Sequence, residues 1–299
     1  MKPKILIDLP ANEYEHPFDK SALNSLRSLK KFDDVVKAFL DWTYVKWEFV
    51  QLKGSHFQVT RESCPELYKL ARDVAKTLSV KDFPEIYTEW GYNVNGYTTG
   101  YKNNTIMMLN SGAIDLLTDT QLRYVIGHEM GHIKSGHVVY HQMATLFGQL
   151  MSSLFMGETV LAPIQYALLY WCRMSEFTAD RAGLLACQSE EEAIKAIVKM
   201  AGVPLKYFER IGNETFIKQA EEFERLNSGV ADSAIRTISI LSSSHPWTVY
   251  RAGELLKWVK SGEYQRIIDT YEGVPCHYCG NIVAKNATYC HVHGGSPFL

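Results

Sequence analysis

Hydrophobic residues recur every three to four positions through most of the chain, which is the spacing of an amphipathic helix. Within residues 1–58 the recurring positions are Leu23, Leu26, Leu29, Val35, Val36, Phe39 and Leu40. The same spacing predicts a helix over 65–78 and mainly helical structure from Thr118 to Trp258. Thr118 is followed three residues later by Gln121, a pattern typical of a capping box at the start of a helix.

Three short segments have the residue pattern of β-strands, and they span 57–60, 85–90 and 105–110. The Gly and Asn residues of segment 95–100 predict turns that join the second strand to the third. Farther along the chain, Pro163 predicts a break in the helical region. The chain is therefore expected to be mainly α with a small β-sheet, which is an α+β fold.

One apolar stretch, residues 142–172, contains a single charged side chain, Glu158. Each of its two apolar runs has about 14 residues, which as a helix spans ~21 Å against a hydrocarbon core of ~30 Å. The stretch therefore predicts a buried or half-exposed helical hairpin, and a membrane-associated hairpin is the less favoured interpretation. The first ten residues lack the apolar run of a secretory signal. We expect a cytoplasmic protein, with membrane association through 142–172 left open.

The composition of the 299-residue chain argues against one class of partner and indicates metal binding. With 31 basic and 33 acidic side chains, the formal net charge is −2, which argues against nucleic acid as a partner. Four of the ten histidines lie between His128 and His141, and three of the six cysteines lie in the last 24 residues. In a reducing compartment, such clusters favour metal ions over disulfides.

The first cluster contains the sequence His128-Glu129-Met130-Gly131-His132, which has the pattern HExxH. Residues four apart lie one turn apart on the same helix face, so both imidazoles can bind one zinc ion. The carboxylate of Glu129 lies beside the same metal, where it can accept a proton from a zinc-bound water and pass it to a leaving amine. The pattern predicts hydrolytic chemistry.

A catalytic zinc ion needs a third protein ligand and one open position for water. Glu176, on a second predicted helix, is the favoured third ligand. Asp180 lies four residues later on the same face, where it can accept a hydrogen bond from a zinc-bound histidine. The alternative is an ordinary acidic pair that Arg173 and Arg181 neutralise.

Two further histidines follow the HExxH pattern. His137 lies nine residues beyond His128, which corresponds to about 180° around a continuous helix, so its side chain is predicted to point away from the metal. We interpret His137 and His141 as structural residues.

Three motifs occur in an order that resembles the metallopeptidase family of the CAAX prenyl protease and the bacterial heat-shock protease HtpX, which are gluzincins. The motifs are Ile126–His137, Arg173–Gly183 and Ser244-His245-Pro246 followed by Arg251. The resemblance extends from about Glu89 to Trp258. Membrane members of the family carry long hydrophobic spans, whereas residues 142–172 are short and partly polar, so the chain resembles a soluble branch. Unfolded or damaged proteins are then the expected substrates, rather than prenylated C-termini.

The resemblance also implies a role for each matching residue. These are His128, His132 and Glu176 as ligands of the catalytic zinc ion, Glu129 as general base and acid, and Asp180 and Arg251 as supporting residues. His245 would stabilise the oxyanion of the tetrahedral intermediate. The segment Asn95-Gly96-Tyr97 would form an edge strand that pairs with the main chain of an extended substrate.

The second cluster consists of two closely spaced ligand pairs near the end of the chain. Its candidate ligands for a structural zinc ion are Cys276, Cys279, Cys290 and His293. His291 is a less favoured fourth ligand because it breaks the two-residue spacing, and Gly280 suits the tight turn after the first pair. The segment is too small to build a core alone, so metal binding would supply its folding free energy. It resembles a zinc ribbon.

These patterns divide the chain into an N-terminal helical segment (1–58), a zincin-type metalloprotease domain (59–270) and a zinc-ribbon-like module (271–299). The expected function is that of a zinc-dependent endopeptidase with one catalytic and one structural Zn²⁺. The alternative is a non-catalytic zinc-binding scaffold or a chaperone-like interaction protein. His16 is interpreted as part of an N-terminal surface loop, with a blocking contact to the catalytic zinc ion as the alternative. The sequence does not predict an oligomeric state.

Overall fold

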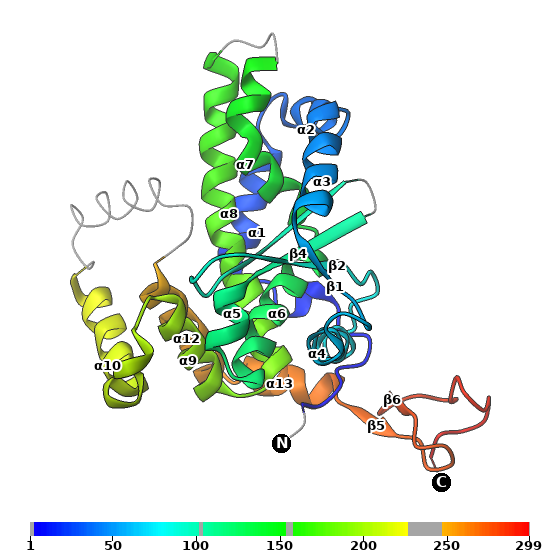
Figure 1. Cartoon of the computed structure of the whole chain (residues 1–299). Helices are drawn as coiled ribbons and strands as arrows, with labels where there is room; N and C mark the ends of the chain where they lie inside the picture. The colour runs from blue at the N-terminus through cyan, green and yellow to red at the C-terminus, as the bar shows by residue number, and fades with distance from the viewer. Residues whose placement is uncertain (1–2, 102–103, 154–157, 227–246, 299) are drawn as a thin grey trace.

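The computed structural model describes residues 3–101, 104–153, 158–226 and 247–298 (Figure 1). Its helices are α1 (Pro17–Arg27), α2 (Phe32–Leu40), α3 (Thr43–Ser55), α4 (Pro65–Thr77), α5 (Ser111–Leu116), α6 (Asp119–Lys134), α7 (Val138–Ser153), α8 (Glu158–Cys187), α9 (Glu190–Met200), α10 (Leu205–Leu226), α12 (Thr248–Lys260) and α13 (Glu263–Tyr271). Its strands are β1 (Phe57–Val59), β2 (Glu85–Glu89), β3 (Gly96–Tyr101), β4 (Asn104–Asn110), β5 (Gly273–Pro275) and β6 (Ile282–Ala284). The predicted α+β class is confirmed.

Helices α6 and α8 pack against each other at the centre of the molecule (Figure 1). A Cβ atom built on Gly127 would lie 2.3 Å from Cβ of Ala186, and one built on Gly131 would lie 2.6 Å from Cβ of Ala182. The two glycines of α6 therefore allow α8 to approach more closely than any side chain would permit. The predicted capping box is confirmed, since Thr118 and Gln121 exchange hydrogen bonds at the start of α6.

A four-stranded mixed sheet has the strand order β1-β2-β4-β3 (Figure 1). The pairs β1–β2 and β3–β4 are antiparallel, and β2–β4 is parallel, with Glu85 opposite Ile106. The turns predicted over residues 95–100 are wrong, because most of this segment forms β3 and pairs with β4 from Gly96 opposite Leu109. Pairing along the whole strand outweighs the local turn preference of its Gly and Asn residues. Strand β3 lies at an edge of the sheet.

The apolar stretch forms the helical hairpin of α7 and α8, against which α1 and α2 pack (Figure 1). Phe147 and Trp171 are buried there with Phe32 of α2. The break predicted at Pro163 is wrong, because α8 runs through this residue. The proline removes one backbone hydrogen bond near the start of a 30-residue helix, and burial of neighbouring apolar side chains such as Leu168 outweighs that loss. None of the helices in the described part of the chain is long and apolar enough to cross a membrane.

The N-terminal segment is part of the packed structure. His16 is buried and caps α1, where the backbone N–H of Phe18 donates to its Nδ1 atom at 3.1 Å. Its Nε2 atom lies 3.3 Å from Oε2 of Glu254 on α12. The surface-loop interpretation is therefore wrong, and the ring of His16 contacts α12. Strand β1 spans residues 57–59, so the predicted boundary at residue 58 falls within a strand.

The glycine contact between α6 and α8 gives a stability prediction. Replacing Gly127 by Ala places a methyl group against Ala186. Overpacking of a tight core costs ~1–3 kcal/mol, which outweighs the gain of ~0.5–1 kcal/mol in helix propensity. We expect Gly127→Ala to lower the free energy of unfolding by about 1–2 kcal/mol in a urea titration followed by circular dichroism.

The matched control is Gly54→Ala in α3, where no atom lies within 4 Å of the added Cβ. This variant should gain up to ~1 kcal/mol from helix propensity alone. Equal stabilisation by both substitutions would show that α6 and α8 are not in tight contact at Gly127.

Candidate metal centres

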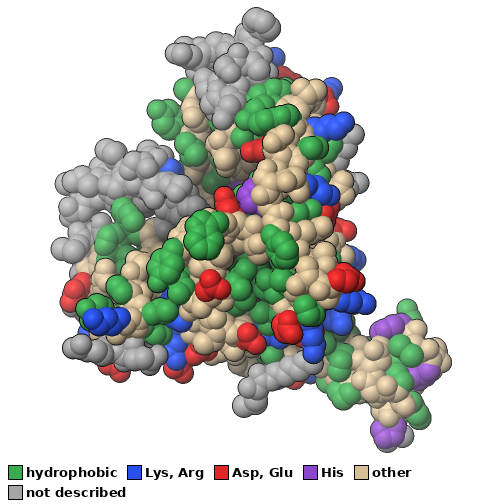
Figure 2. Space-filling view, viewed as in Figure 1, with side chains coloured by type: hydrophobic (Ala, Val, Ile, Leu, Met, Phe, Trp, Pro, Cys, Tyr) green, Lys and Arg blue, Asp and Glu red, His purple; other side chains and the backbone are tan. Residues whose placement is uncertain are grey.

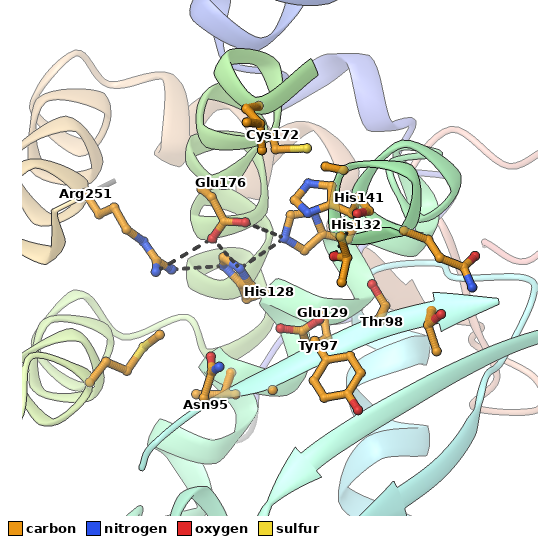
Figure 3. Close-up of a pocket in the computed structure, with 18 of the residues that line it drawn as sticks. Asn95, Tyr97, Thr98, His128, Glu129, His132, His141, Cys172, Glu176 and Arg251 are labelled. Atoms are coloured by element: carbon orange, nitrogen blue, oxygen red, sulfur yellow. Dashed lines mark hydrogen bonds and ion pairs between the residues drawn. The ribbon is translucent and has the colours of Figure 1, made fainter. Parts of the chain in front are cut away.

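Three potential ligand atoms converge where α6 meets α8 (Figure 3). The Nε2 atoms of His128 and His132 are 3.2 Å apart. Oε2 of Glu176 lies 3.3 Å from Nε2 of His128, and Oε1 of the same carboxylate lies 3.3 Å from Nε2 of His132. A tetrahedral zinc site with bonds of ~2.0–2.1 Å has edges of ~3.3 Å between its ligand atoms. All three side chains are buried, and their spacing and chemistry fit a zinc ion.

A buried ion pair supports one side of this cluster. Arg251 of α12 donates from Nε to Oδ2 of Asp180 at 2.9 Å and from Nη2 to Oδ1 at 2.6 Å. Oδ1 of Asp180 also accepts from the hydroxyl of Tyr124 at 2.7 Å and lies 3.0 Å from Nδ1 of His128. Burial raises the pKa of Asp180, but Arg251 and His128 outweigh it and hold this pKa below its usual range.

The cation that pairs with Asp180 is Arg251, whereas the alternative interpretation of the sequence named Arg173 and Arg181. Arg251 also lies 3.7 Å from Glu176, so it contacts the carboxylates of both Glu176 and Asp180 on α8. By contrast, Arg173 donates to the backbone carbonyl of Leu169, and Arg181 donates to that of Glu15. The cation that contacts both Asp180 and Glu176 is thus Arg251, which the alternative interpretation did not include.

The two histidines of the cluster have opposite pKa shifts. Burial lowers the pKa of His128, but its contacts with the carboxylates of Asp180 and Glu176 outweigh this and raise it to about 9. Burial dominates at His132 and lowers its pKa to about 4. The cluster therefore favours an arrangement in which His132 is neutral and offers a nitrogen lone pair.

Glu129 lies beside the cluster on α6 and faces the same cavity (Figure 3). It is buried, and its Oε2 atom has no hydrogen-bond partner within the described part of the chain. Burial raises the pKa of Glu129 to about 7. A buried carboxylate oxygen without a partner is unfavourable for the isolated fold, and a group that enters the cavity would satisfy it.

A cavity of about 550 Å³ opens in front of these residues. Its lining includes His128, Glu129, His132 and Glu176, together with residues 95–99, which lead into and form β3. A Cβ atom on Gly96 would lie 3.3 Å from Cγ of Glu129, so the strand passes directly over this glutamate. The cavity is therefore lined both by the edge strand of the sheet and by the candidate metal ligands.

His137 occupies a different position from the predicted one. Helix α6 ends at Lys134 and α7 begins at Val138, so His137 lies in the turn between them and not on a continuous helix. Its Nδ1 atom is 3.1 Å from Nδ1 of His132. The prediction that His137 points away is therefore wrong. His141 is also nearby, with Nε2 2.7 Å from Oγ of Ser175.

Asp19 of α1 is a buried residue that the sequence patterns did not single out. Its Oδ2 atom lies 3.3 Å from Nε2 of His137 and accepts from the Thr178 hydroxyl at 2.6 Å. Its Oδ1 atom accepts from the indole N–H of Trp171 at 2.8 Å. An acidic residue in the first turn of a helix is common, so only the contact with His137 distinguishes it.

The residue expected to stabilise the oxyanion, His245, lies outside the described residues. The other predicted site residues on the peptidase region do lie together. These are Asn95, Gly96, Tyr97, His128, Glu129, His132, Glu176 and Arg251 around the cavity, and Asp180 behind His128.

A second cluster lies in the C-terminal segment, which projects from the rest of the molecule (Figure 2). Sγ of Cys276 lies 3.1 Å from Nε2 of His293, and Sγ of Cys279 lies 3.6 Å from Sγ of Cys290. The alternative ligand His291 is outside this cluster, because its Nε2 atom lies 2.8 Å from the side-chain amide of Asn281. Gly280 has a φ of +70°, as the tight turn after the first pair requires. The four atoms fit a Cys₃His site.

A buried His/His/Glu set next to a second buried glutamate, in a cavity beside a sheet edge, fits a metal-dependent peptidase site. The chain belongs to peptidase family M48, whose sequence profile matches residues 63–259. The expected resemblance to the gluzincins is thereby confirmed. The protein is a zinc-dependent metallopeptidase, and its substrates are polypeptides.

Individual relatives support the same family. Plastoglobule-localized metallopeptidase 48, a chloroplastic protein of Arabidopsis thaliana, is 28% identical over 269 residues, which cover 89% of this chain and 78% of the relative. A protease HtpX homolog of Polynucleobacter necessarius is 24% identical over 69% of this chain and 78% of its own length. One from Sulfurihydrogenibium is 25% identical over 69% of this chain and 79% of the relative. No solved structure matches the chain.

The buried ion pair gives a second stability prediction. In Arg251→Met, the carboxylates of Asp180 and Glu176 lose their buried cation, and such a loss typically costs ~3–5 kcal/mol. We expect the free energy of unfolding to fall by that amount in a urea titration of the metal-free protein.

The control is Lys195→Met, which removes the ion pairs of Lys195 with Glu191 and Glu192 on the surface of α9. Exposed pairs contribute under ~1 kcal/mol. A loss at Arg251 no larger than at Lys195 would contradict the buried network.

Proposed function

We propose that this metallopeptidase is an endopeptidase that cleaves extended segments of unfolded or damaged proteins. The observation that carries the proposal is the common cavity of the three converging ligand atoms and the unpartnered oxygen of Glu129. His128, His132 and Glu176 would hold the catalytic zinc ion. A bound zinc ion supplies Lewis acidity, which polarises a peptide carbonyl and lowers the pKa of water toward ~7.

Glu129 moves the proton in this proposal. Its carboxylate follows the first histidine by one residue on α6, so it lies beside the ligand cluster and faces the cavity. The partner-free Oε2 atom can accept a proton from an attacking water and deliver it to the leaving amine. The buried position keeps competing solvent away from this oxygen.

Asp180 and Arg251 hold His128 in the orientation that this role requires. Asp180 accepts a hydrogen bond from the Nδ1–H group of His128, which leaves Nε2 as the lone-pair donor toward the metal. Arg251 in turn fixes Asp180 through two hydrogen bonds. We keep His245 as the proposed oxyanion-stabilising residue on the sequence resemblance alone.

The substrate class follows from the wall formed by Asn95, Gly96 and Tyr97. Among the described residues, β3 pairs on one side only, with β4, and it lines the cavity. An edge strand binds a peptide through main-chain hydrogen bonds, which needs an extended segment and little sequence specificity. A folded protein does not present such a segment, so unfolded chains are the favoured substrates.

We assign the C-terminal cluster to a structural zinc ion, held by the four-ligand set of Cys276, Cys279, Cys290 and His293. The four ligands leave no open position for a substrate. The segment has a small apolar cluster of its own around Val283, so metal binding would supply much of its folding free energy. We accordingly retain residues 271–299 as a separate module beside the peptidase domain, and we move the boundary proposed between 1–58 and 59–270 to before β1, which pairs with β2.

The test of the peptidase proposal is Glu129→Gln. The substitution keeps the shape of the side chain but removes its ability to accept a proton. Since general acid–base catalysis contributes ~10²–10⁴-fold, we expect cleavage of unfolded casein to fall by at least about 10²-fold. Zinc content, measured by atomic emission, should stay unchanged because Glu129 is not one of the proposed ligands.

The matched control is Glu62→Gln, which makes the same chemical change at an exposed position. It should cut casein at the wild-type rate. Equal cleavage by wild type and Glu129→Gln would contradict the assigned role of Glu129. Faster cleavage of a folded protein than of its unfolded form would contradict the proposed substrate class.

A further inference from the structure

The two candidate histidine ligands are supported in different ways. His128 contacts a carboxylate directly, because its Nδ1 atom lies 3.0 Å from Asp180. The Nδ1 atom of His132 instead faces the Nδ1 atom of His137 at 3.1 Å. On its far side, Nε2 of His137 lies 3.3 Å from Oδ2 of Asp19. A chain of polar contacts thus runs from the proposed metal site through His137 to α1.

The carboxylate of Asp19, at the end of this chain, determines which ring nitrogen of His137 carries the proton. Oδ2 of Asp19 accepts from the Thr178 hydroxyl, and Oδ1 accepts from the indole N–H of Trp171. An ionised carboxylate only accepts hydrogen bonds, so Nε2 of His137 must be the donor in its contact with Asp19. A neutral His137 then has a lone pair on Nδ1, which accepts a hydrogen bond from the Nδ1–H group of His132. When a metal ion is held by Nε2 of His132 and by Glu176, the one proton of a neutral His132 is on Nδ1, where His137 accepts its hydrogen bond.

Asp19 lies in a buried, hydrogen-bonded environment. The side chains of Asp19, His137, Trp171 and Thr178 are all buried. The Thr178 hydroxyl, which donates to Asp19, itself accepts from the backbone N–H of His16 at 3.0 Å. Burying a carboxylate is unfavourable unless it is fully hydrogen-bonded. Asp19 meets this condition through its contacts with Thr178, Trp171 and His137.

We propose that α1 supplies a positioning residue to the peptidase site, in which Asp19 acts through His137 to hold the proton of His132 on Nδ1 and keep Nε2 free for the metal. The inference rests on the proposed zinc site of His128, His132 and Glu176. Asp19 lies outside residues 63–259, which match the family profile, so the N-terminal segment contributes to the site from beyond the matched region. Removal of α1 then weakens metal binding and does not merely expose the apolar face of α8.

The decisive variant is Asp19→Asn in the full-length chain. The amide has one acceptor oxygen in place of two, so its NH₂ group can donate to Nε2 of His137. His137 would then carry its proton on Nδ1 and force the proton of His132 onto Nε2, where it blocks the metal. Loss of an outer hydrogen-bonding partner weakens metal binding by ~10–100-fold. We expect a zinc dissociation constant at least about tenfold higher at the site that His132→Ala abolishes, measured by competition with a chromophoric chelator.

The control variant is Glu254→Gln, which alters a different polar contact of the N-terminal segment, the part-buried one between His16 and Glu254 of α12. It should leave the zinc dissociation constant within about twofold of the wild type if the effect of Asp19 acts through His137 rather than through loosened packing. Equal weakening by both variants would overturn the proposal.

Histidine side-chain NMR provides a readout in the wild type itself. His137 should carry its proton on Nε2, facing Asp19, and this proton should move to Nδ1 in Asp19→Asn. A wild-type His137 with its proton on Nδ1 overturns the proposal, as does a zinc affinity that Asp19→Asn leaves unchanged. If wild type and His132→Ala bind the same amount of zinc, the proposed metal site itself fails, which is a separate result.

Discussion

The close approach of α6 and α8 is the constraint on which the site depends. Gly127 and Gly131 remove the side chains that would hold the two helices apart. The imidazoles of α6 and the carboxylate of Glu176 on α8 can then converge to about 3.3 Å. The same helix pair forms the centre of the hydrophobic core, so the packing that stabilises the protein also sets the spacing of the ligands.

The buried charges around this contact form two groups, one behind each candidate histidine ligand. Asp180 with Arg251 lies behind His128, and Asp19 with His137 lies behind His132. Each carboxylate is satisfied by several donors, so burial does not leave an isolated charge. The two supports come from opposite parts of the chain, α12 and α1. The cavity beside the ligands is also lined by β3, whose sheet edge suits an extended polypeptide.

The features that were predicted correctly from local sequence patterns are those that depend on a single helix. The capping box at Thr118 and the HExxH spacing required only a helical repeat, and both the helix and the convergence of its two histidines follow from that repeat. The turn preference of segment 95–100 was misleading because a partner strand decides its structure. His137 was misplaced because the helix ends before it, and Asp19 was missed because it reaches the site from more than a hundred residues away. Residues that lie so far apart in the sequence show no local spacing from which their contact could be predicted.

The central claim is that a buried His/His/Glu set on α6 and α8 binds the catalytic zinc ion. Crystals grown with zinc test it through anomalous scattering at the zinc absorption edge. The account predicts one ion bonded to His128, His132 and Glu176 at ~2.0–2.2 Å, and a second ion within the Cys₃His cluster. An ion held instead by the neighbouring cluster of His132, His137 and His141, or no ion beside Glu176, would contradict it.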